Sequence, residues 1–441
     1  MSLITFSSIA IDFRCKNKQY FQIEAVLTII SFAKPKCGKN LDFYANHKIE
    51  FVFLHKISVM IERSIEEKLR QMTTKFPVVT LTGTRQCGKS TLLRQRFKEF
   101  KYISLEDVDH RQFALDDPRG FLMNFGSPLI IDEAQYAPDL FSYIQTRVDE
   151  QNERGMYILS GSHNFLLMER ISQSLAGRTA VMKMAPLSIS ELRQTSLLSD
   201  NLNEWLITGG YPRIYDAEIA PVDFFPNYIQ TYLERDVRLL RNISDMSQFI
   251  RFLKLCAGRV GQLLNVASLA NETGISVPTA NAWLSILETS YTIFLLKPYY
   301  KNFNKRLVKS PKLYFCDTGL AASLLGLENA QQLETHYLRG ELFENMVVAE
   351  FVKQAYAKGR EPNLYFWRDS NNDEVDLLSE QGTDLECYEI KSAATMHTDH
   401  FSSLKTFAKQ AQLDTNRLHV IYGGDHNIQT SNGDYISWKN L

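Results

Sequence analysis

The sequence predicts an α/β protein built from at least three units. From Pro77 onward, short apolar runs alternate with helical patterns, which is typical of a parallel sheet with crossover helices. Beyond Leu342, a helical pattern is followed by three strand patterns. Helical patterns without strands run from about Leu187 to about Leu287, so they separate two α/β units.

The composition excludes several protein classes. The chain has 441 residues, of which 22% are charged and 44% hydrophobic, so it can bury sizeable cores and is neither disordered nor fibrous. A net charge of −1 gives no global field that would attract nucleic acid or an anionic membrane. Any site for a polyanion must therefore be local.

Cysteine usage and hydropathy together predict a cytoplasmic protein without a membrane partner. The six cysteines are scattered and form no CxxC pair, which favours a reducing compartment. The apolar stretch at residues 25–33 is far shorter than the roughly 20 residues that span a bilayer. No small-residue cleavage site follows it.

A phosphate-binding loop is predicted at Gly83–Ser90, which satisfies the pattern G-x-x-x-x-G-K-[ST] between a strand at 78–81 and a helix at 91–100. In this context backbone N–H groups and the helix N-terminus bind phosphate, Lys89 bridges the β- and γ-phosphates of ATP, and Ser90 ligates Mg²⁺. The predicted nucleotide-binding residues are Gly83, Thr84, Arg85, Gln86, Cys87, Gly88, Lys89, Ser90 and Thr91.

The apolar strand at 129–131 ends in Asp132 and Glu133, as a Walker B strand does. We expect Asp132 to hold Mg²⁺ through water and Glu133 to polarise the attacking water. The alternative is a buried strand capped by solvated acids.

With these motifs, the chain from Met60 onward resembles the prokaryotic AAA-type ATPases that carry a C-terminal domain of unknown function. The resemblance implies an ATP-binding AAA fold with a helical lid, and leaves the biological task open. Its motifs, in order, are GTRQCGKSTLL, PLIIDEAQ, ILSGS, SLAGR, PLSISEL, GGYP and YLERD.

The AAA resemblance suggests two further roles, each with a plainer alternative. Ser162 or Asn164, after the next strand, could sense the γ-phosphate, or could belong to a turn that satisfies its own backbone. Arg178 could be an arginine finger that reaches a neighbouring copy in a homo-oligomer, or a surface arginine. Cys87 could sense oxidation, but a small residue tolerated in the loop is the simpler interpretation.

The pattern of residues 266–284 predicts a helix, a glycine turn and a second helix. Ser276 would cap the second helix, and Pro278 fits its first turn. This pattern predicts a winged-helix module in which Thr279 and Asn281 could face a DNA major groove. Basic residues mixed with aromatics follow at 297–306 and at Lys309 and Lys312, as in a wing that contacts phosphates. An inert packing module is the alternative.

The C-terminal unit carries a predicted metal site. Asp376 lies on one strand pattern, and Glu389 and Lys391 share one face of the next, while Glu344 lies on the preceding helix. Three carboxylates suit Mg²⁺ or Mn²⁺, and Lys391 could point at a water that the metal activates. The set resembles the PD-(D/E)xK nuclease superfamily and its α-β-β-β-α-β order. A nuclease-type fold that has lost hydrolysis is the alternative.

These patterns predict an ATPase with slow hydrolysis that acts on or near DNA, and a non-hydrolysing switch that binds partner proteins is the alternative. Residues 1–59 are expected to be an extension, either disordered or placed upstream of a true start at Met60. The remaining boundaries are 60–190 for the P-loop ATPase core, 191–250 for the helical lid, 251–325 for the winged-helix-like module and 335–441 for the nuclease-like domain.

Overall fold

The computed structural model divides the chain into two units, Met1–Met60 and Ile61–Leu441. In the first it describes only two antiparallel strands, β1 (Ile9–Arg14) and β2 (Tyr20–Ala25). The sequence analysis did not predict this hairpin, although Ile9, Ile11 and Phe13 alternate along β1. In the second unit the described residues are 61–161, 167, 168, 171, 173–233, 245–299, 309–369, 371–382 and 384–441.

Five parallel strands form the first sheet of the second unit, in the order β4-β5-β6-β3-β7. Their bounds are Lys101–Ser104 for β4, Leu129–Asp132 for β5, Tyr157–Ser160 for β6, Val78–Gly83 for β3 and Thr179–Met184 for β7. The mixed α/β prediction with a parallel sheet is therefore confirmed. The strand β7 was not predicted from the sequence.

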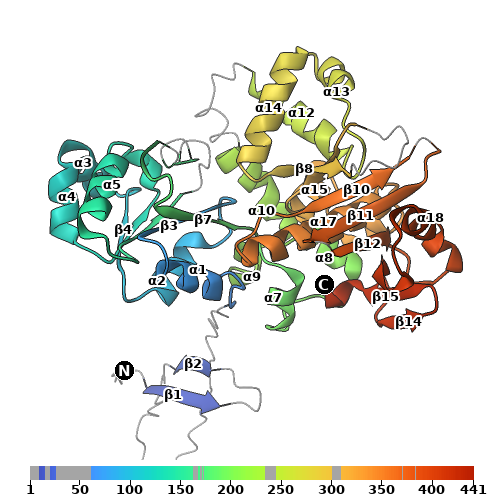
Figure 1. The fold of residues 1–441 in the computed structure, drawn as a ribbon, viewed down its shortest axis with the longest axis horizontal. Coiled ribbons are helices and arrows are strands. Elements are labelled where there is room, and N and C mark those ends of the chain that lie inside the picture. Colours follow the sequence, from blue (N-terminus) through green and yellow to red (C-terminus); the bar gives the residue numbers. More distant parts are fainter. Residues whose placement is uncertain are drawn as a thin grey trace, which may run out of the picture. The chain divides into compact units, whose positions relative to one another are not determined.

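Helices cover both faces of this sheet (Figure 1). On one face, Leu69 and Leu92 pack against Val79 and Ile130. On the other, Phe121 and Ile144 lie in a separate core cluster. The first face carries α1 (Glu66–Thr73) and α2 (Lys89–Arg96), and the second carries α3 (Val108–Asp116), α4 (Pro118–Phe125) and α5 (Leu140–Gln151).

Short helices follow, as the sequence predicted. Ser188 begins the first of them with a capping box, in which its side chain and that of Glu191 bind each other's backbone N–H groups. Ser276 caps α14 by accepting from the Thr279 N–H. The bounds are α7 (Ile189–Arg193), α8 (Leu202–Thr208), α9 (Pro212–Asp216), α10 (Pro221–Tyr228), η2 (Ile229–Leu233), α12 (Met246–Ala257), α13 (Val266–Thr273) and α14 (Val277–Thr289).

The second sheet has eight strands in the order β14-β15-β13-β12-β11-β10-β8-β9. The hairpin β8/β9 comes from the middle of the chain, and β8 pairs in parallel with β10, so the middle and C-terminal regions share one sheet. The strands are β8 (Ile293–Pro298), β9 (Lys312–Phe315), β10 (Leu364–Arg368), β11 (Glu374–Gln381), β12 (Asp384–Lys391), β13 (Leu418–Tyr422), β14 (Ile428–Thr430) and β15 (Gly433–Ser437).

Two helices pack on opposite faces of the eight-stranded sheet. The long helix α17 (Arg339–Ala357) buries Phe343 and Val347 in one core, and α18 (Ser402–Ala411) buries Leu404 and Phe407 in another. The short helices α15 (Thr318–Leu324) and α16 (Ala330–Glu334) lead into α17. The expected order of one helix, three strands, one helix and one strand is present from α17 to β13.

Candidate functional site

The phosphate loop follows β3 and begins at a position that only glycine can occupy. A Cβ on Gly83, whose φ is +145°, would lie 1.9 Å from the carbonyl oxygen of Met184 on β7. Gly88 has φ +98° at the start of α2, in the region that favours glycine. Both glycines of the motif are therefore required by the backbone path of the loop.

Lys89 is held inside this loop. Its side chain is buried, and its Nζ donates to the carbonyl oxygens of Gly83 and Thr84, both at 2.9 Å. These two oxygens belong to the turn that would cradle a phosphate. The ammonium therefore stands at the loop, where a short side-chain rotation can exchange carbonyl oxygens for phosphate oxygens.

The remaining predicted loop residues differ in exposure. Cys87 is buried and its thiol donates to the Met184 carbonyl at 3.4 Å, which supports the structural interpretation of this residue. Thr84 is buried with no hydrogen-bond partner for its Oγ1. Arg85, Gln86 and Ser90 are partly buried. Thr91 is exposed.

Asp132 ends β5 and is almost fully buried. Its carboxylate accepts hydrogen bonds from Tyr102 on β4, from Ser160 at the end of β6, and from the Glu133 N–H at 3.2 Å. Burial, followed by the negative charge of Asp132, raises the pKa of Tyr102. The two hydroxyl donors fix the orientation of this carboxylate.

The sequence analysis missed Tyr102 and Ser160. It had placed the polar residue after β6 at Ser162 or Asn164, both of which lie outside the described residues. The signal for Ser160 was available, since it is the last residue of a strand that lies beside β5 in the sheet. No sequence pattern pointed to Tyr102, because its hydrogen bond to Asp132 depends on β4 lying beside β5 in the sheet.

Glu133 follows Asp132 with a left-handed backbone, φ +53°. Its Oε2 accepts from the side-chain amide of Gln135 at 2.5 Å. In a parallel sheet the carboxyl ends of β3 and β5 share one edge, so the phosphate loop and the two acids stand at the same edge. This is the arrangement that the two motifs predicted.

Arg178 lies at the other end of the sheet. It precedes β7, whose first residue pairs with Val78 while its last pairs with Gly83, so about 16 Å of strand separates it from the loop. Its guanidinium binds both carboxylate oxygens of Asp149, at 2.6 and 2.8 Å. Arg178 therefore cannot reach the phosphate loop of its own chain.

A second cluster of charged side chains lies on the eight-stranded sheet. Strands β11 and β12 pair antiparallel as far as Leu377 opposite Tyr388, and Asp376 and Glu389 lie one step beyond that pair. Asp376 accepts from the Ile390 N–H at 2.8 Å, and Lys391 donates to Glu389 at 2.6 Å. Three of the predicted residues thus converge.

Glu344 approaches the same cluster from α17. Its Oε1 accepts from Lys312 Nζ at 2.9 Å and from the Tyr314 hydroxyl at 2.5 Å, and both donors lie on β9. Lys312 also forms an ion pair with Glu374. The sequence analysis had assigned Lys312 to a DNA-contacting wing; this was wrong, because the side chain is 3% exposed and points at these carboxylates.

Two carboxyls of this cluster, those of Asp376 and Glu389, have raised pKa values. Burial, followed by the charge of Glu344, raises the pKa of Asp376 to about 7. Burial, followed by the charge of Asp376, raises the pKa of Glu389 to about 8. The Oε2 atom of Glu389 is buried without a hydrogen-bond partner. This oxygen and Asp376 are donors of the hard type that Mg²⁺ and Mn²⁺ prefer.

In the described part of the chain, no three Asp, Glu, His or Cys side chains are arranged to hold a metal ion as they stand. The ammonium groups of Lys312 and Lys391 occupy oxygens of Glu344 and Glu389 instead. A divalent cation bound by Glu344, Asp376 and Glu389 would have to displace one of these lysine contacts.

The helix pair α13 and α14 has the predicted glycine turn, with Gly274 in a left-handed conformation. Asn281 is exposed and Thr279 is partly buried on the surface of α14. Of the basic residues in the predicted wing, Lys297 and Lys309 are exposed, whereas those at 301, 305 and 306 lie outside the described residues.

Comparison with known families divides the chain into three matched segments. Residues 75–193 match an AAA domain, residues 199–331 match a domain of unknown function, DUF8612, and residues 339–441 match another, DUF4143. Two whole-chain relatives are the uncharacterized protein Rv2008c of Mycobacterium tuberculosis and the uncharacterized protein Mb2031c of Mycobacterium bovis. Each is 32% identical over 394 residues, covering 88% of this chain and 86% of the relative.

Among solved structures, the Walker-type ATPase PABY2304 of Pyrococcus abyssi aligns with a TM-score of 0.38 and 17% identity, covering 60% of this chain and 96% of that one. AMPPCP-bound DnaA of Aquifex aeolicus aligns with a TM-score of 0.26 and 15% identity, covering 51% and 85%. None of the helices in the described ranges has the length and apolar character needed to cross a membrane.

Proposed function

The chain belongs to the AAA-type ATPase family that includes the mycobacterial protein Rv2008c, and from this premise we propose that it hydrolyses ATP slowly. The observation that carries this proposal is the pairing of a lysine-bearing phosphate loop with Asp132 and Glu133 at one edge of a parallel sheet. ATP is the substrate, and Ser90 and Asp132 are the residues that would hold Mg²⁺. When bound, the cation would neutralise charge on the phosphates.

The chain's own residues have distinct roles in this mechanism. Lys89 leaves the Gly83 and Thr84 carbonyls and binds phosphate oxygens. Glu133 orients the attacking water and accepts its proton. Tyr102 and Ser160 hold the Asp132 carboxylate in one orientation, so this carboxylate does not have to reorient when nucleotide enters.

The C-terminal cluster is the proposed second site. Glu344, Asp376 and Glu389 would hold Mg²⁺ or Mn²⁺, and Lys391 would orient a water for attack on a nucleic-acid phosphate. The buried, unpartnered Oε2 of Glu389 supports this assignment, as does the hydrogen bond that Asp376 accepts from the N–H of Ile390, the residue after Glu389. The exposed Asn281 and Lys297 would contact DNA if the middle helices act as a winged helix.

A non-hydrolysing switch that binds partner proteins is the second candidate. It is favoured by the two lysines, which already neutralise the carboxylates that a nuclease metal would need. In that case the C-terminal fold is retained for binding alone.

One assay set separates these functions. The protein is mixed with single- and double-stranded DNA, with and without ATP and Mn²⁺, and phosphate release, gel shift and DNA cleavage are measured. We expect phosphate release that Glu133→Gln abolishes. Absence of phosphate release with intact ATP binding would reject hydrolysis. Absence of Mn²⁺ binding and of cleavage of any DNA or RNA would reject the nuclease role and leave the switch.

A further inference from the structure

Arg63 lies before α1, far from the phosphate-loop motif in sequence, yet it contacts the loop. One guanidinium nitrogen donates to the Cys87 carbonyl at 2.5 Å, and another donates to the Ala185 carbonyl at 2.7 Å. The Arg63 side chain is only 9% exposed. One planar group therefore joins the loop to the end of β7.

Glu191 on α7 holds this arginine in place. Its Oε1 lies 3.2 Å from Arg63 Nε and accepts the Ser64 N–H at 2.7 Å, while its Oε2 accepts the Ser188 N–H at 3.0 Å. With both oxygens used and the side chain 6% exposed, Glu191 cannot shift without disturbing both the segment before α1 and the start of α7.

The start of α7 is in turn bound to α17. Glu350 Oε2 accepts the Ile189 N–H at 2.8 Å, and Lys353 Nζ donates to the Leu187 carbonyl at 2.9 Å and to Glu350 at 2.7 Å. Both side chains are buried. Glu350 lies six positions after Glu344 on the same helix, so α17 carries both the contact with α7 and a member of the carboxylate cluster.

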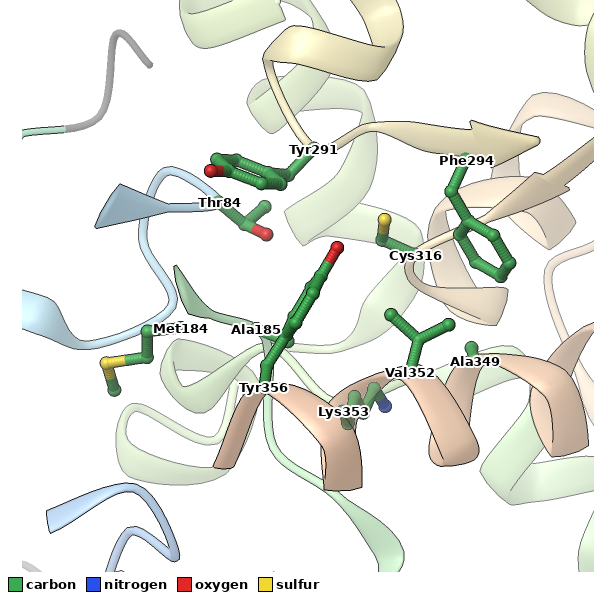
Figure 2. A pocket seen from close by; sticks show the side chains of 10 residues that line it. All are labelled: Thr84, Met184, Ala185, Tyr291, Phe294, Cys316, Ala349, Val352, Lys353 and Tyr356. Atoms are coloured by element: carbon green, nitrogen blue, oxygen red, sulfur yellow. The ribbon is translucent and has the colours of Figure 1, made fainter. Parts of the chain in front are cut away.

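Direct packing between the loop and α17 is incomplete. A narrow cavity lies between them, with Thr84 on the loop side and Val352 and Tyr356 on α17 (Figure 2). A polar contact, between Thr82 on β3 and the Tyr291 hydroxyl at 2.8 Å, links β3 to a residue two positions before β8.

We infer that Arg63 is a positioning residue for the phosphate loop and that the chain Arg63–Glu191–α7–Glu350/Lys353 couples ATP binding to the C-terminal carboxylate site through α17. This inference rests on the proposed ATP site. When Lys89 exchanges loop carbonyls for phosphate oxygens, the loop backbone must adjust, and the Cys87 carbonyl carries that adjustment to Arg63. Such coupling is reciprocal, so occupation of either site should alter the other.

The test uses full-length Glu133→Gln protein, which is expected to bind ATP without turnover. Amide hydrogen exchange in residues 339–357 and 374–391 is measured with and without ATP, together with the ATP dissociation constant. We expect ATP to slow exchange in both segments by about fivefold or more, the lower end of ordinary coupling. ATP binding without any change in either segment would overturn the coupling, whereas failure to bind ATP would reject the proposed function itself.

Two conservative variants separate positioning from general stability. Arg63→Lys keeps the charge but cannot bridge two carbonyls and Glu191, so ATP affinity should fall about tenfold. Arg70→Lys, on α1 and paired with Glu66 and Glu99, is the matched control and should bind ATP normally. Unchanged ATP affinity in Arg63→Lys would overturn the positioning role.

Glu350→Gln tests the far end of the chain of contacts. It preserves side-chain size and should bind ATP within about threefold of the parent, but should lose most of the exchange response in 374–391. A full response in this variant would remove Glu350 from the pathway. If Glu350→Gln melts well below the parent, Glu191→Gln serves the same purpose on the Arg63 side of the chain of contacts, and a full response there contradicts the inference equally.

Discussion

At the scale of single residues, two buried lysines each bind a pair of oxygen atoms, but the two ammonium groups differ in whether a ligand can displace those oxygens. Lys89 is bound by two backbone carbonyls, which are neutral and easily exchanged for phosphate. Lys312 is bound by two carboxylates, which are charged and partly buried. The first ammonium is therefore available to a ligand, whereas the second is part of the fold.

Lys89→Ala should abolish ATP binding, because it removes the ammonium that lies within the loop beside Gly83 and Thr84. Glu133→Gln should keep binding and block turnover, since it removes the proton acceptor but no phosphate contact. Equilibrium binding of a fluorescent ATP analogue and phosphate release check both. Unchanged nucleotide affinity in Lys89→Ala would refute the site assignment.

The carboxyls of the C-terminal cluster should make stability depend on pH. Their folded-state pKa values, about 7 for Asp376 and about 8 for Glu389, lie above the unfolded values of 3.8 and 4.5. The native state therefore binds more protons between about pH 4 and pH 8, and its stability falls as pH rises through that window. In EDTA, the thermal midpoint should drop from pH 5 to pH 8.5, and Asp376→Asn should flatten the dependence. An equally steep curve in Asp376→Asn would contradict this assignment.

At the scale of elements, β9 shows why a local pattern can mislead. The hairpin β8/β9 extends the C-terminal sheet, so Lys312 meets carboxylates from α17 and β11 that are distant in sequence. Its neighbourhood in sequence is basic and aromatic, and only the long-range pairing reveals that the side chain is buried. The hairpin therefore joins two regions that the sequence analysis had separated.

Lys312→Met should destabilise the protein by about 1–3 kcal/mol, because it leaves the partly buried Glu344 and Glu374 close together without their shared cation. Urea unfolding measures the change. Lys309→Met, an exposed residue on the approach to β9, is the matched control and should lie within about 0.5 kcal/mol of the parent. If the cluster binds metal, Mn²⁺ should restore part of the loss in Lys312→Met, and a near-neutral Lys312→Met would show that the ion pairs carry no stability.

The predictable parts of the fold and site are those whose signal is local. The strand β3, the loop glycines and the caps of α14 follow from a few adjacent residues. Tyr102, Ser160 and Arg63 could not be assigned, because each acts on a segment that only strand order or helix packing brings near. The half-buried strand β7 was missed for a related reason: its mixed polar and apolar residues do not indicate a strand by themselves, and its pairing with β3 is a long-range contact.

At the scale of the whole molecule, the position of Arg178, at the end of the sheet opposite to the phosphate loop, has a consequence for the oligomeric state. Since strand length separates it from its own phosphate loop, any role in hydrolysis must be exerted on a second copy of the chain. Its present partner, Asp149, is about half exposed, and surface pairs of this kind are weak. The guanidinium can therefore leave Asp149 for a neighbour at little cost.

If Arg178 acts in trans, Arg178→Ala should lower phosphate release by about 10³-fold or more while ATP affinity stays unchanged, because the finger stabilises charge that develops only in the transition state. Mixing Arg178→Ala with Glu133→Gln protein should restore activity, since hybrid interfaces contain one Glu133 and one Arg178 from different chains. Asp149→Ala is the control: it frees Arg178 and should not reduce turnover. Specific activity that is independent of protein concentration, measured on a chain that sediments as a monomer, would remove Arg178 from the reaction.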